Sequence, residues 1–352
     1  MSKLFEPLKV GDLVWPNRIV MAPLTRCRAD AGRVPNALMA EYYAQRASAG
    51  LILSEATSVT PMGVGYPDTP GIWSEAQVEG WKQVTRAVHA AGGRIFMQLW
   101  HVGRVSHPDH LAGELPVAPS AIAPQGHVSL LRPMRDYVVP RALETDEIPG
   151  IVEAYRQGAE NAKRAGFDGV EIHGANGYLL DQFLQDSTNQ RTDRYGGSLE
   201  NRLRLPLEVA DAVIGVWGAN RVGYHIAPRC DSHTMGDSDP LATFTALARE
   251  LGKRDVAFLF ARESQDAPRL GPAIKQAFGG IYIANQGLTP DAAESLLARD
   301  EADAVSWGQA FIANADLPLR LASGKPLNKP QPETFYGYGL NDPRLGYVDY
   351  AA

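Results

Sequence analysis

The chain repeats one pattern eight times: a short apolar run rich in β-branched residues, followed directly or after an insertion by a segment with helical periodicity. The expected strands are residues 19–22, 51–54, 95–99, 169–172, 222–226, 256–260, 281–284 and 304–307. The expected helices are residues 36–48, 74–91, 148–165, 199–216, 240–252, 271–278, 289–298 and 311–322. Because eight strand–helix units match a closed (β/α)8 arrangement, the sequence predicts an α/β protein built as a TIM barrel.

An open, doubly wound sheet is the alternative that the same alternation allows. That fold commonly carries a Gly-x-Gly-x-x-Gly turn after its first strand, and no such turn follows residues 19–22. No internal repeat, low-complexity tract or linker divides the sequence. We therefore expect a single domain over residues 1–352.

Two segments account for much of the length beyond the roughly 250 residues that a TIM barrel needs. Residues 100–146 contain six prolines and separate the third strand from its helix. A connection of this length is a lid or binding loop more often than passive surface. The tail, residues 326–352, is rich in Tyr, Pro and Gly. Its tyrosines predict packing against the barrel mouth or against another subunit.

Charge and composition exclude several classes of partner. The net charge is −6, from 34 basic and 40 acidic residues, without a basic block, which argues against a nucleic-acid partner. No apolar run approaches the roughly 20 residues of a membrane helix, and residues 1–6 lack the layout of a secretory signal. Cys27 and Cys230 lie far apart and form no metal-binding spacing. We expect a cytoplasmic protein with reduced thiols, no metal site and no membrane contact.

Small and polar residues follow the first three expected strands, and in a barrel such residues gather at one end. Pro23, Leu24 and Thr25 follow the first strand, where the proline fixes the backbone and leaves amides and a hydroxyl free to meet a ring edge. Ala56 follows the second strand and leaves room for a flat ligand. Gln98, in the third, offers both a donor and an acceptor.

Two further segments predict an anion site. Gln286 and Gly287 follow the seventh strand, and Gly308 and Gln309 follow the eighth, where backbone N–H groups and a helix N-terminus would face a bound anion. Phosphate sites at this place occur in barrels of many functions. The segments therefore predict phosphate binding without identifying the ligand.

The most informative stretch is residues 168–202, which reads DGVEIHGANGYLLDQF and continues to RTDRYGGSLENR. His173 ends a strand, and Asn176 and Tyr178 follow as the chain turns toward a helix, which predicts a site that polarises a carbonyl and protonates its neighbour. The motif resembles the Old Yellow Enzyme family of flavin-dependent ene-reductases. Similar segments, NRIVMAPLTR at 17–26 and AEYYAQR at 40–46 among them, extend the resemblance over essentially the whole chain.

The resemblance implies an FMN-dependent NAD(P)H:enone oxidoreductase that uses NADPH or NADH to reduce C=C bonds conjugated to a carbonyl or nitro group. His173 and Asn176 would grip the activating oxygen, and Tyr178 would supply the proton. FMN would contact Pro23 to Thr25, Ala56, Gln98 and residue 225, with its phosphate near strands seven and eight. Activated alkenes would be the small-molecule partners, in a monomer or homodimer. The cavity for the alkene would be lined by Tyr66, Trp100 and Tyr336.

Two positions depart from the family pattern. His225 and Gln309 stand where family members carry arginine beside the flavin ring and the phosphate. Losing one guanidinium contact would weaken FMN binding on the order of tenfold to a hundredfold. An imidazole with an ordinary pKa of about 6.5 would also make the flavin chemistry depend on pH.

Two other functions remain open from the residues alone. A non-redox barrel acting on a phosphorylated substrate would need a base at a strand end, for which Glu55, Glu171 and Glu263 are the acidic candidates. The other alternative is a barrel with impaired cofactor binding that acts as a binding protein. His225 and Gln309 are the residues that suggest it.

Overall fold

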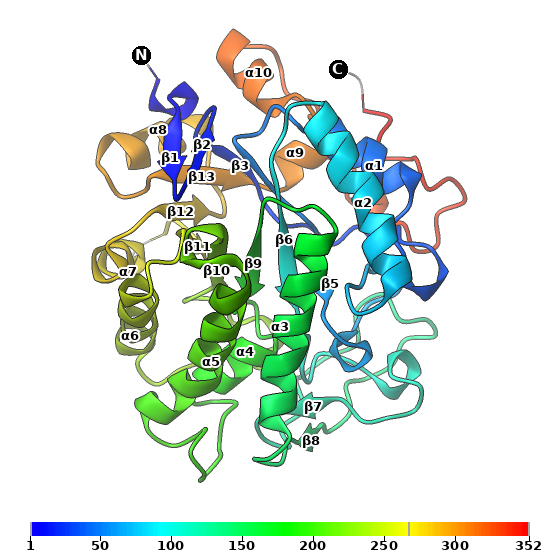
Figure 1. The fold of residues 1–352 in the computed structure, drawn as a ribbon, viewed down its shortest axis with the longest axis vertical. Helices are drawn as coiled ribbons and strands as arrows, with labels where there is room; N and C mark the ends of the chain where they lie inside the picture. Colours follow the sequence, from blue (N-terminus) through cyan, green and yellow to red (C-terminus); the bar gives the residue numbers. More distant parts are fainter. Residues whose placement is uncertain (1, 267, 351–352) are drawn as a thin grey trace.

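Eight parallel strands form a closed barrel in the computed structural model, which describes residues 2–266 and 268–350 (Figure 1). The pairings of β13 with β3 and of β4 with β6 close the ring, and the short β5 (Thr57–Ser58) adds to β6. The predicted TIM barrel is therefore confirmed. Its strands are β3 (Ile19–Met21), β4 (Leu51–Leu53), β6 (Ile95–Trp100), β9 (Gly169–His173), β10 (Val222–Ile226), β11 (Phe258–Arg262), β12 (Tyr282–Asn285) and β13 (Ala304–Trp307).

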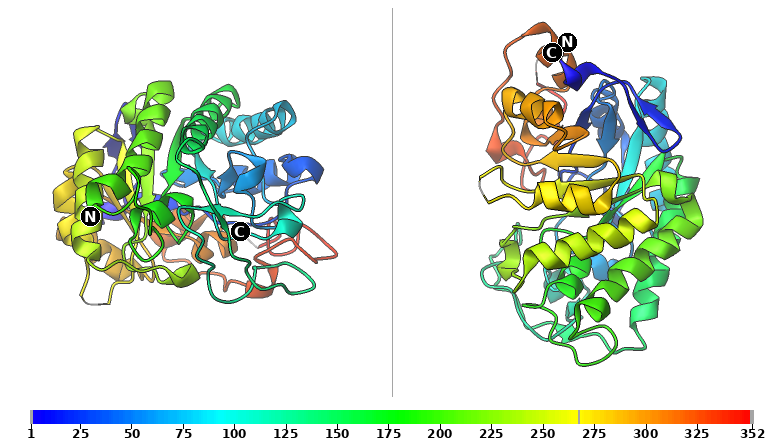
Figure 2. Two further views of the ribbon diagram at one scale, coloured as in Figure 1. Left: turned by 90° about the horizontal axis from the view of Figure 1, so that it is seen from below. Right: turned by 90° about the vertical axis from the view of Figure 1, so that its left-hand side faces the viewer.

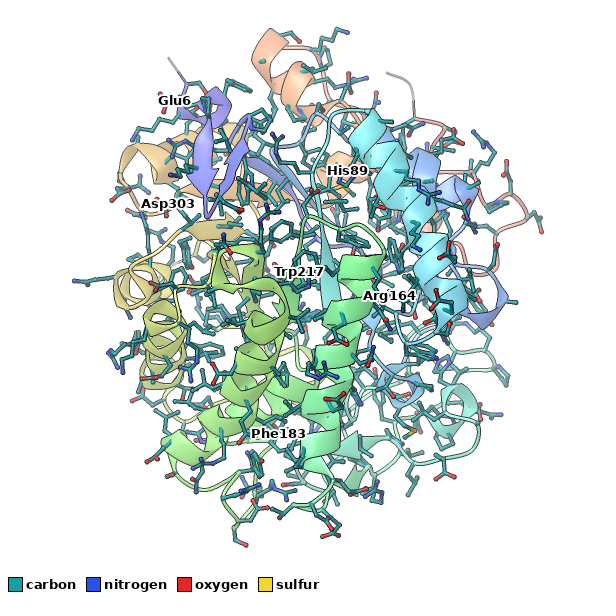
Figure 3. The ribbon with its side chains drawn as sticks, viewed as in Figure 1. Glu6, His89, Arg164, Phe183, Trp217 and Asp303 are labelled. Atoms are coloured by element: carbon teal, nitrogen blue, oxygen red, sulfur yellow. The ribbon has the colours of Figure 1, made fainter. Side chains whose placement is uncertain are left out.

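Helices surround the barrel, as the views in Figure 2 show. They are α1 (Ala37–Ala44), α2 (Glu75–Ala90), α3 (Ile148–Arg164), α5 (Leu199–Trp217), α6 (Pro240–Lys253), α7 (Gly271–Phe278) and α8 (Pro290–Ala298). Neighbouring helices also bond to each other: Trp217 at the end of α5 donates from Nε1 to the Ala159 carbonyl of α3 at 3.0 Å (Figure 3). No helix among these described residues is long and apolar enough to cross a membrane.

The structure corrects three of the expected elements. The helix predicted at 311–322 is two helices, α9 (Gln309–Ala313) and α10 (Leu317–Ser323), because the Asn314 side chain bonds the backbone of Ala310 and Asn328 and Pro318 has no N–H to donate. The helix toward which the chain was expected to turn after Tyr178, absent from the expected ranges, is the short α4 (Leu179–Leu184). The strand predicted at 256–260 begins and ends two residues later, at Phe258 and Arg262.

Apolar side chains fill the barrel and close one of its ends. The strand residues are almost all buried, as expected for parallel strands that are covered on both faces. An N-terminal hairpin, β1 (Leu8–Val10) with β2 (Leu13–Trp15), packs against the interior residues, and the Trp15 ring meets the Phe258 ring edge-on at 5.9 Å. A ligand can therefore enter only where the strands end.

The long segment after β6 lies at the end of the barrel to which β6 and β9 point (Figure 1). It contains a 3-10 turn, η4 (Pro108–His110), and two short paired strands, β7 (Val117–Ala118) and β8 (Arg141–Ala142). Arg104 ties it down with bonds to the Ile122 carbonyl at 2.9 Å and the His233 carbonyl at 2.7 Å. That this segment acts as a lid stays a prediction.

The C-terminal tail packs on the barrel through three buried arginines. Arg28 donates to four carbonyls of residues 334–345, and Arg26 donates to those of Phe335 and Gly346. The Tyr347 ring stacks on Tyr42 at 4.0 Å with an interplanar angle of 5°, and guanidinium groups lie over both rings. The tail tyrosine Tyr347 thus packs on α1 of the same chain.

Tyr347→Ala should destabilise the protein by about 3–5 kcal/mol, because it removes a fully buried ring and its stacking contact with Tyr42. The matched control is Tyr338→Ala in the same tail, where the ring is 38% exposed and the change should stay within about 0.5 kcal/mol. Urea unfolding of the two variants measures the difference. Equal stability of both would mean that the tail is not anchored by this stack.

Candidate active site

Strand register brings the polar residues of the site together. Gln98 of β6 lies beside Glu171 of β9, and His173 of β9 lies beside His225 of β10. All four side chains are nearly or fully buried, in strands that are otherwise apolar. Because the three strands are parallel, these residues meet at the open end of the barrel.

The turn after β9 presents two hydrogen-bond donors. His173 accepts the Ala175 N–H at Nδ1 over 3.3 Å, so its Nε2 carries the proton and is free to donate. Burial lowers the pKa of His173 to about 3, and the nearby Arg262 adds to the shift, so the ring is neutral. Asn176 follows with φ +59°, a left-handed conformation that asparagine tolerates, and Gly177 continues the turn with φ +79°.

Tyr178 forms a hydrogen-bonded pair with Tyr66. The two hydroxyl oxygens are 2.9 Å apart, and burial raises the pKa of both phenols. Trp100 stacks against the Tyr66 ring at 5.5 Å and meets the Tyr178 ring edge-on at 5.0 Å. Tyr66, predicted as a cavity wall, therefore positions the Tyr178 hydroxyl directly.

Beneath these groups, Gln98 connects Glu171 and His225. Its Nε2 donates to Glu171 Oε2 at 2.6 Å and to His225 Nδ1 at 3.0 Å, which leaves its carbonyl oxygen for a ligand. Since His225 Nδ1 accepts, its Nε2 carries the proton, and this buried Nε2 has no partner among the described residues. Burial raises the pKa of Glu171 to about 8, so the carboxyl is protonated at neutral pH.

The expected titration of His225 near neutral pH is wrong. Burial, with smaller contributions from His173 and Arg262, lowers the pKa of His225 well below its ordinary value. The imidazole is therefore neutral over mildly acid to mildly alkaline pH. Glu171 is the group beside it that titrates in this range.

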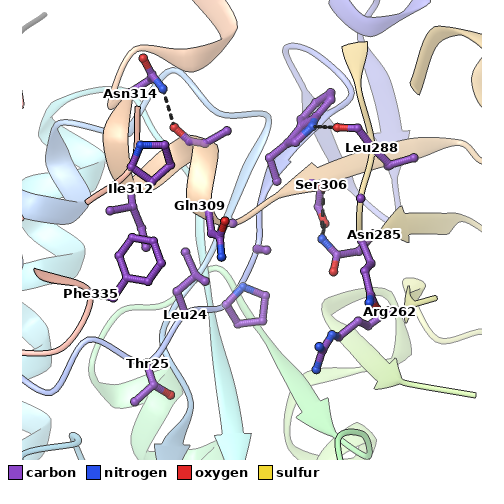
Figure 4. Close-up of a pocket in the computed structure, with 18 of the residues that line it drawn as sticks. Leu24, Thr25, Arg262, Asn285, Leu288, Ser306, Gln309, Ile312, Asn314 and Phe335 are labelled. Carbon is purple, nitrogen blue, oxygen red and sulfur yellow. Dashed lines mark hydrogen bonds between the residues drawn. The ribbon is translucent and has the colours of Figure 1, made fainter. Parts of the chain in front are cut away.

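Two adjoining cavities hold nearly all of the predicted residues. The larger, of about 920 Å³, is lined by Leu24, Gln286, Gly287, Gly308, Gln309 and Tyr336 among others (Figure 4). The smaller, of about 90 Å³, is lined by Ala56, Gln98, Trp100, His173 and Tyr178 among others. Pro23, Thr25, Asn176 and His225 line both, and of the predicted residues Tyr66 alone lines neither. The predicted constellation is thus brought together in space.

Of the two features that predicted the phosphate site, the backbone N–H groups and a helix N-terminus, the helix N-terminus is the weaker one in the structure. The helix that opens at Gln309 has only five residues, so it contributes little of the dipole that the sequence argument invoked. Gln286 has φ +92° and Gly287 φ +68°, and a Cβ added to Gly287 would meet no heavy atom within 4 Å. The backbone here is therefore open to a close-lying ligand.

Sequence reasoning missed Arg262, Phe260 and Lys329, which also line the larger cavity. Phe260 packs edge-on against His225 at 4.4 Å. The strand was expected to end at residue 260, which put Arg262 in the following loop. A strand boundary set two residues later would have identified Arg262 as a residue of the strand end. Lys329 lies in the tail, and nothing local in the sequence places a tail residue beside the barrel mouth.

The residues present fit a planar anionic cofactor. The cavity volume lies within the range of about 300–1,000 Å³ typical of small-molecule sites. His225 Nε2 is a buried donor without a partner, and Gly287 leaves a backbone cradle. Among the described residues that line the cavity, Arg262 and Lys329 are basic and none is Asp or Glu.

A TIM barrel whose open end joins a cavity for a flat anion to two neutral donors and a phenol defines a flavin-dependent oxidoreductase of the ene-reductase class. A family model supports this: the model of the NADH:flavin oxidoreductase / NADH oxidase family matches residues 3–328. The chain belongs to this family, the family of Old Yellow Enzyme.

Relatives match over nearly the whole length. The chain is 44% identical over 364 residues to 12-oxophytodienoate reductase 1 of Oryza sativa subsp. japonica, covering 99% of this chain and 92% of the rice protein. Among solved structures, the old yellow enzyme homologue from Zymomonas mobilis has a TM-score of 0.95 at 46% identity, with 99% of each chain covered. Morphinone reductase in complex with tetrahydroNAD has a TM-score of 0.95 at 49% identity, covering 100% of this chain and 98% of that one.

Glu171→Gln should stabilise the protein relative to the wild type increasingly as pH rises from about 5 to about 8. The native carboxyl keeps its proton up to about pH 8, whereas the unfolded one loses it near its ordinary pKa, so unfolding releases a proton and wild-type stability falls over this range. Melting temperatures at several pH values measure the difference. Glu114→Gln, an exposed control with the same charge change, should show no such trend. A pH-independent offset for Glu171→Gln would show that Glu171 is ionised in the native state.

Proposed function

We propose that the protein is an FMN-dependent NAD(P)H ene-reductase that reduces C=C bonds conjugated to a carbonyl or nitro group. The observation that carries the proposal is the meeting of His173, Asn176 and Tyr178 beside the wall that the two cavities share. A lyase or isomerase would need a lysine or carboxylate base at a strand end. Neither cavity is lined by a described Asp or Glu, and Lys329, which lines the larger cavity, lies in the tail after α10, which argues against that alternative.

The cavity residues have distinct parts in holding FMN. Thr25, Ala56 and the side-chain carbonyl of Gln98 would face the flavin ring. The Nε2–H of His225 would donate to the oxygen-bearing edge of that ring. The phosphate would lie along the stretch lined by Gln286, Gly287, Gly308 and Gln309, with Lys329 as the nearby cation. When bound, FMN supplies the hydride chemistry between the nicotinamide and the alkene.

His173 and Asn176 would bind the oxygen that activates the alkene. A neutral imidazole donates from Nε2 without a competing titration, and the Asn176 amide adds a second donor. Both donors are fixed before substrate arrives, so they stabilise the negative charge that develops on the oxygen without having to reorganise.

Tyr178 would supply the proton. Its hydroxyl is held by Tyr66 at 2.9 Å, and burial disfavours the tyrosinate, so the phenol keeps its proton at any working pH until the reaction takes it. The Tyr66 hydroxyl can donate to Tyr178 as that proton leaves. Trp100 packs against both rings and excludes water from the pair.

The comparisons support the two classes of reactant. Several relatives are 12-oxophytodienoate reductases, and one similar structure is a morphinone reductase holding tetrahydroNAD. We infer for this chain an electron-poor alkene as oxidant and NADPH or NADH as reductant.

Titration with FMN tests the proposal. The purified protein should quench FMN fluorescence at one site per chain, and anaerobic NADPH or NADH should bleach the bound-flavin absorbance, which an enone then restores. FMN should bind more tightly than riboflavin, because only FMN reaches the phosphate end. Failure to bind FMN at micromolar concentrations, or flavin that no enone reoxidises, would contradict the proposed activity.

Tyr178→Phe should slow alkene reduction by 10²-fold or more while sparing reduction of the flavin by nicotinamide, because only the second half-reaction needs the proton. Stopped-flow measurement of the two half-reactions separates them. Tyr66→Phe is the companion variant: it keeps the Tyr178 hydroxyl and should cost less. Equal slowing of both half-reactions in Tyr178→Phe would remove Tyr178 from the role of acid.

A further inference from the structure

Arg262 reaches into the larger cavity from the end of β11 (Figure 4). Its Nη1 donates to Asn176 Oδ1 at 2.9 Å, and Cys230 Sγ is 4.0 Å away. Within residues 2–266 and 268–350, no carboxylate forms an ion pair with it. The adjacent Glu263 instead accepts the N–H groups of Leu270 and Gly271 and lies 3.8 Å from Arg229. A half-buried cation with a neutral partner therefore faces the ligand space.

The contact determines which way the Asn176 amide faces. A guanidinium group has only donors, so the amide must turn its oxygen toward Arg262. The backbone of Asn176 is fixed as well, since its carbonyl accepts from His233 Nδ1 at 2.8 Å. The NH₂ group is then directed away from Arg262, and no described residue accepts from it.

The positive charge also acts on the surroundings of the amide. Arg262 contributes to the lowered pKa values of His173, His225 and His233. Arg104 is a second cation that acts on His233. Arg262 also acts on the phenol of Tyr178. No described Asp or Glu lines the wall shared by the two cavities.

We propose that Arg262 is a positioning residue for the reaction: its guanidinium holds the Asn176 amide with the NH₂ group toward the substrate oxygen and adds a permanent positive charge behind that donor. The inference rests on the proposed function, because it assigns the oxygen of the activated alkene to this pocket. Without Arg262 the amide is free to flip and present its oxygen, which repels the substrate oxygen. A charge-assisted hydrogen bond also makes the amide a stronger donor.

The test uses p-nitrophenol as the probe with FMN-loaded protein, because this phenol reports its ionisation by absorbance. Wild type should bind the phenolate preferentially and lower the pKa of the bound phenol. Arg262→Met should weaken phenolate binding on the order of tenfold and raise the pKa of the bound phenol by about one unit. Arg262→Lys, which keeps a cationic donor, should recover part of the loss. The matched control is Arg229→Met, whose side chain lies outside both cavities and whose loss should leave phenolate binding unchanged.

A thermodynamic cycle with Asn176→Ala assigns the effect. If Arg262 acts mainly through the amide, Arg262→Met should cost clearly less in the Asn176→Ala background than in the wild type, with only the direct effect of the charge remaining. A full cost in that background, or wild-type phenolate affinity in Arg262→Met, overturns the inference. Loss of FMN affinity in Arg262→Met with unchanged phenolate binding to the loaded fraction also overturns it, because Arg262 would then serve the cofactor. A wild type that binds no FMN contradicts the proposed function itself, and the Kd for FMN of each protein separates that outcome from the others.

Discussion

The parallel register of β6, β9 and β10 is the constraint on which the rest of the site depends. It sets Gln98 beside Glu171 and His173 beside His225, and it does so through backbone hydrogen bonds that do not involve these side chains. Because the strands are buried on both faces, polar groups there must find partners within the protein or in a ligand. Gln98 satisfies two of them, and the Nε2 of His225 is left for whatever occupies the cavity.

Burial then controls the charge of the site. The pKa values of His173 and His225 are lowered and that of Glu171 is raised, so three groups that titrate in water are neutral at neutral pH. The basic side chains that line the larger cavity, Arg262 and Lys329, come from outside the predicted motifs. His225 and Gln309 bring no permanent positive charge to the cavity, so that charge comes from these neighbouring elements instead.

The open end of the barrel is completed by segments distant in sequence. Arg26, Arg28 and Arg46, all in or near the first strand–helix unit, bind the carbonyls of the tail and hold Tyr347 against Tyr42. The tail in turn contributes Phe335, Tyr336 and Lys329 to the cavity wall. The segment that these arginines anchor thus also shapes the site.

The sequence by itself determined the barrel, because eight apolar runs that alternate with helical segments can be recognised from local sequence alone, without knowing which residues are in contact. It also determined the motif of His173, Asn176 and Tyr178, whose spacing lies within one strand and turn. Only the tertiary structure decided which groups are charged and which way the donors face, since those depend on burial and on partners such as Glu171 and Tyr66 from other strands and loops. Arg262 shows the reason most directly: its role comes from a contact 86 positions away in the sequence, and no local pattern encodes such a contact.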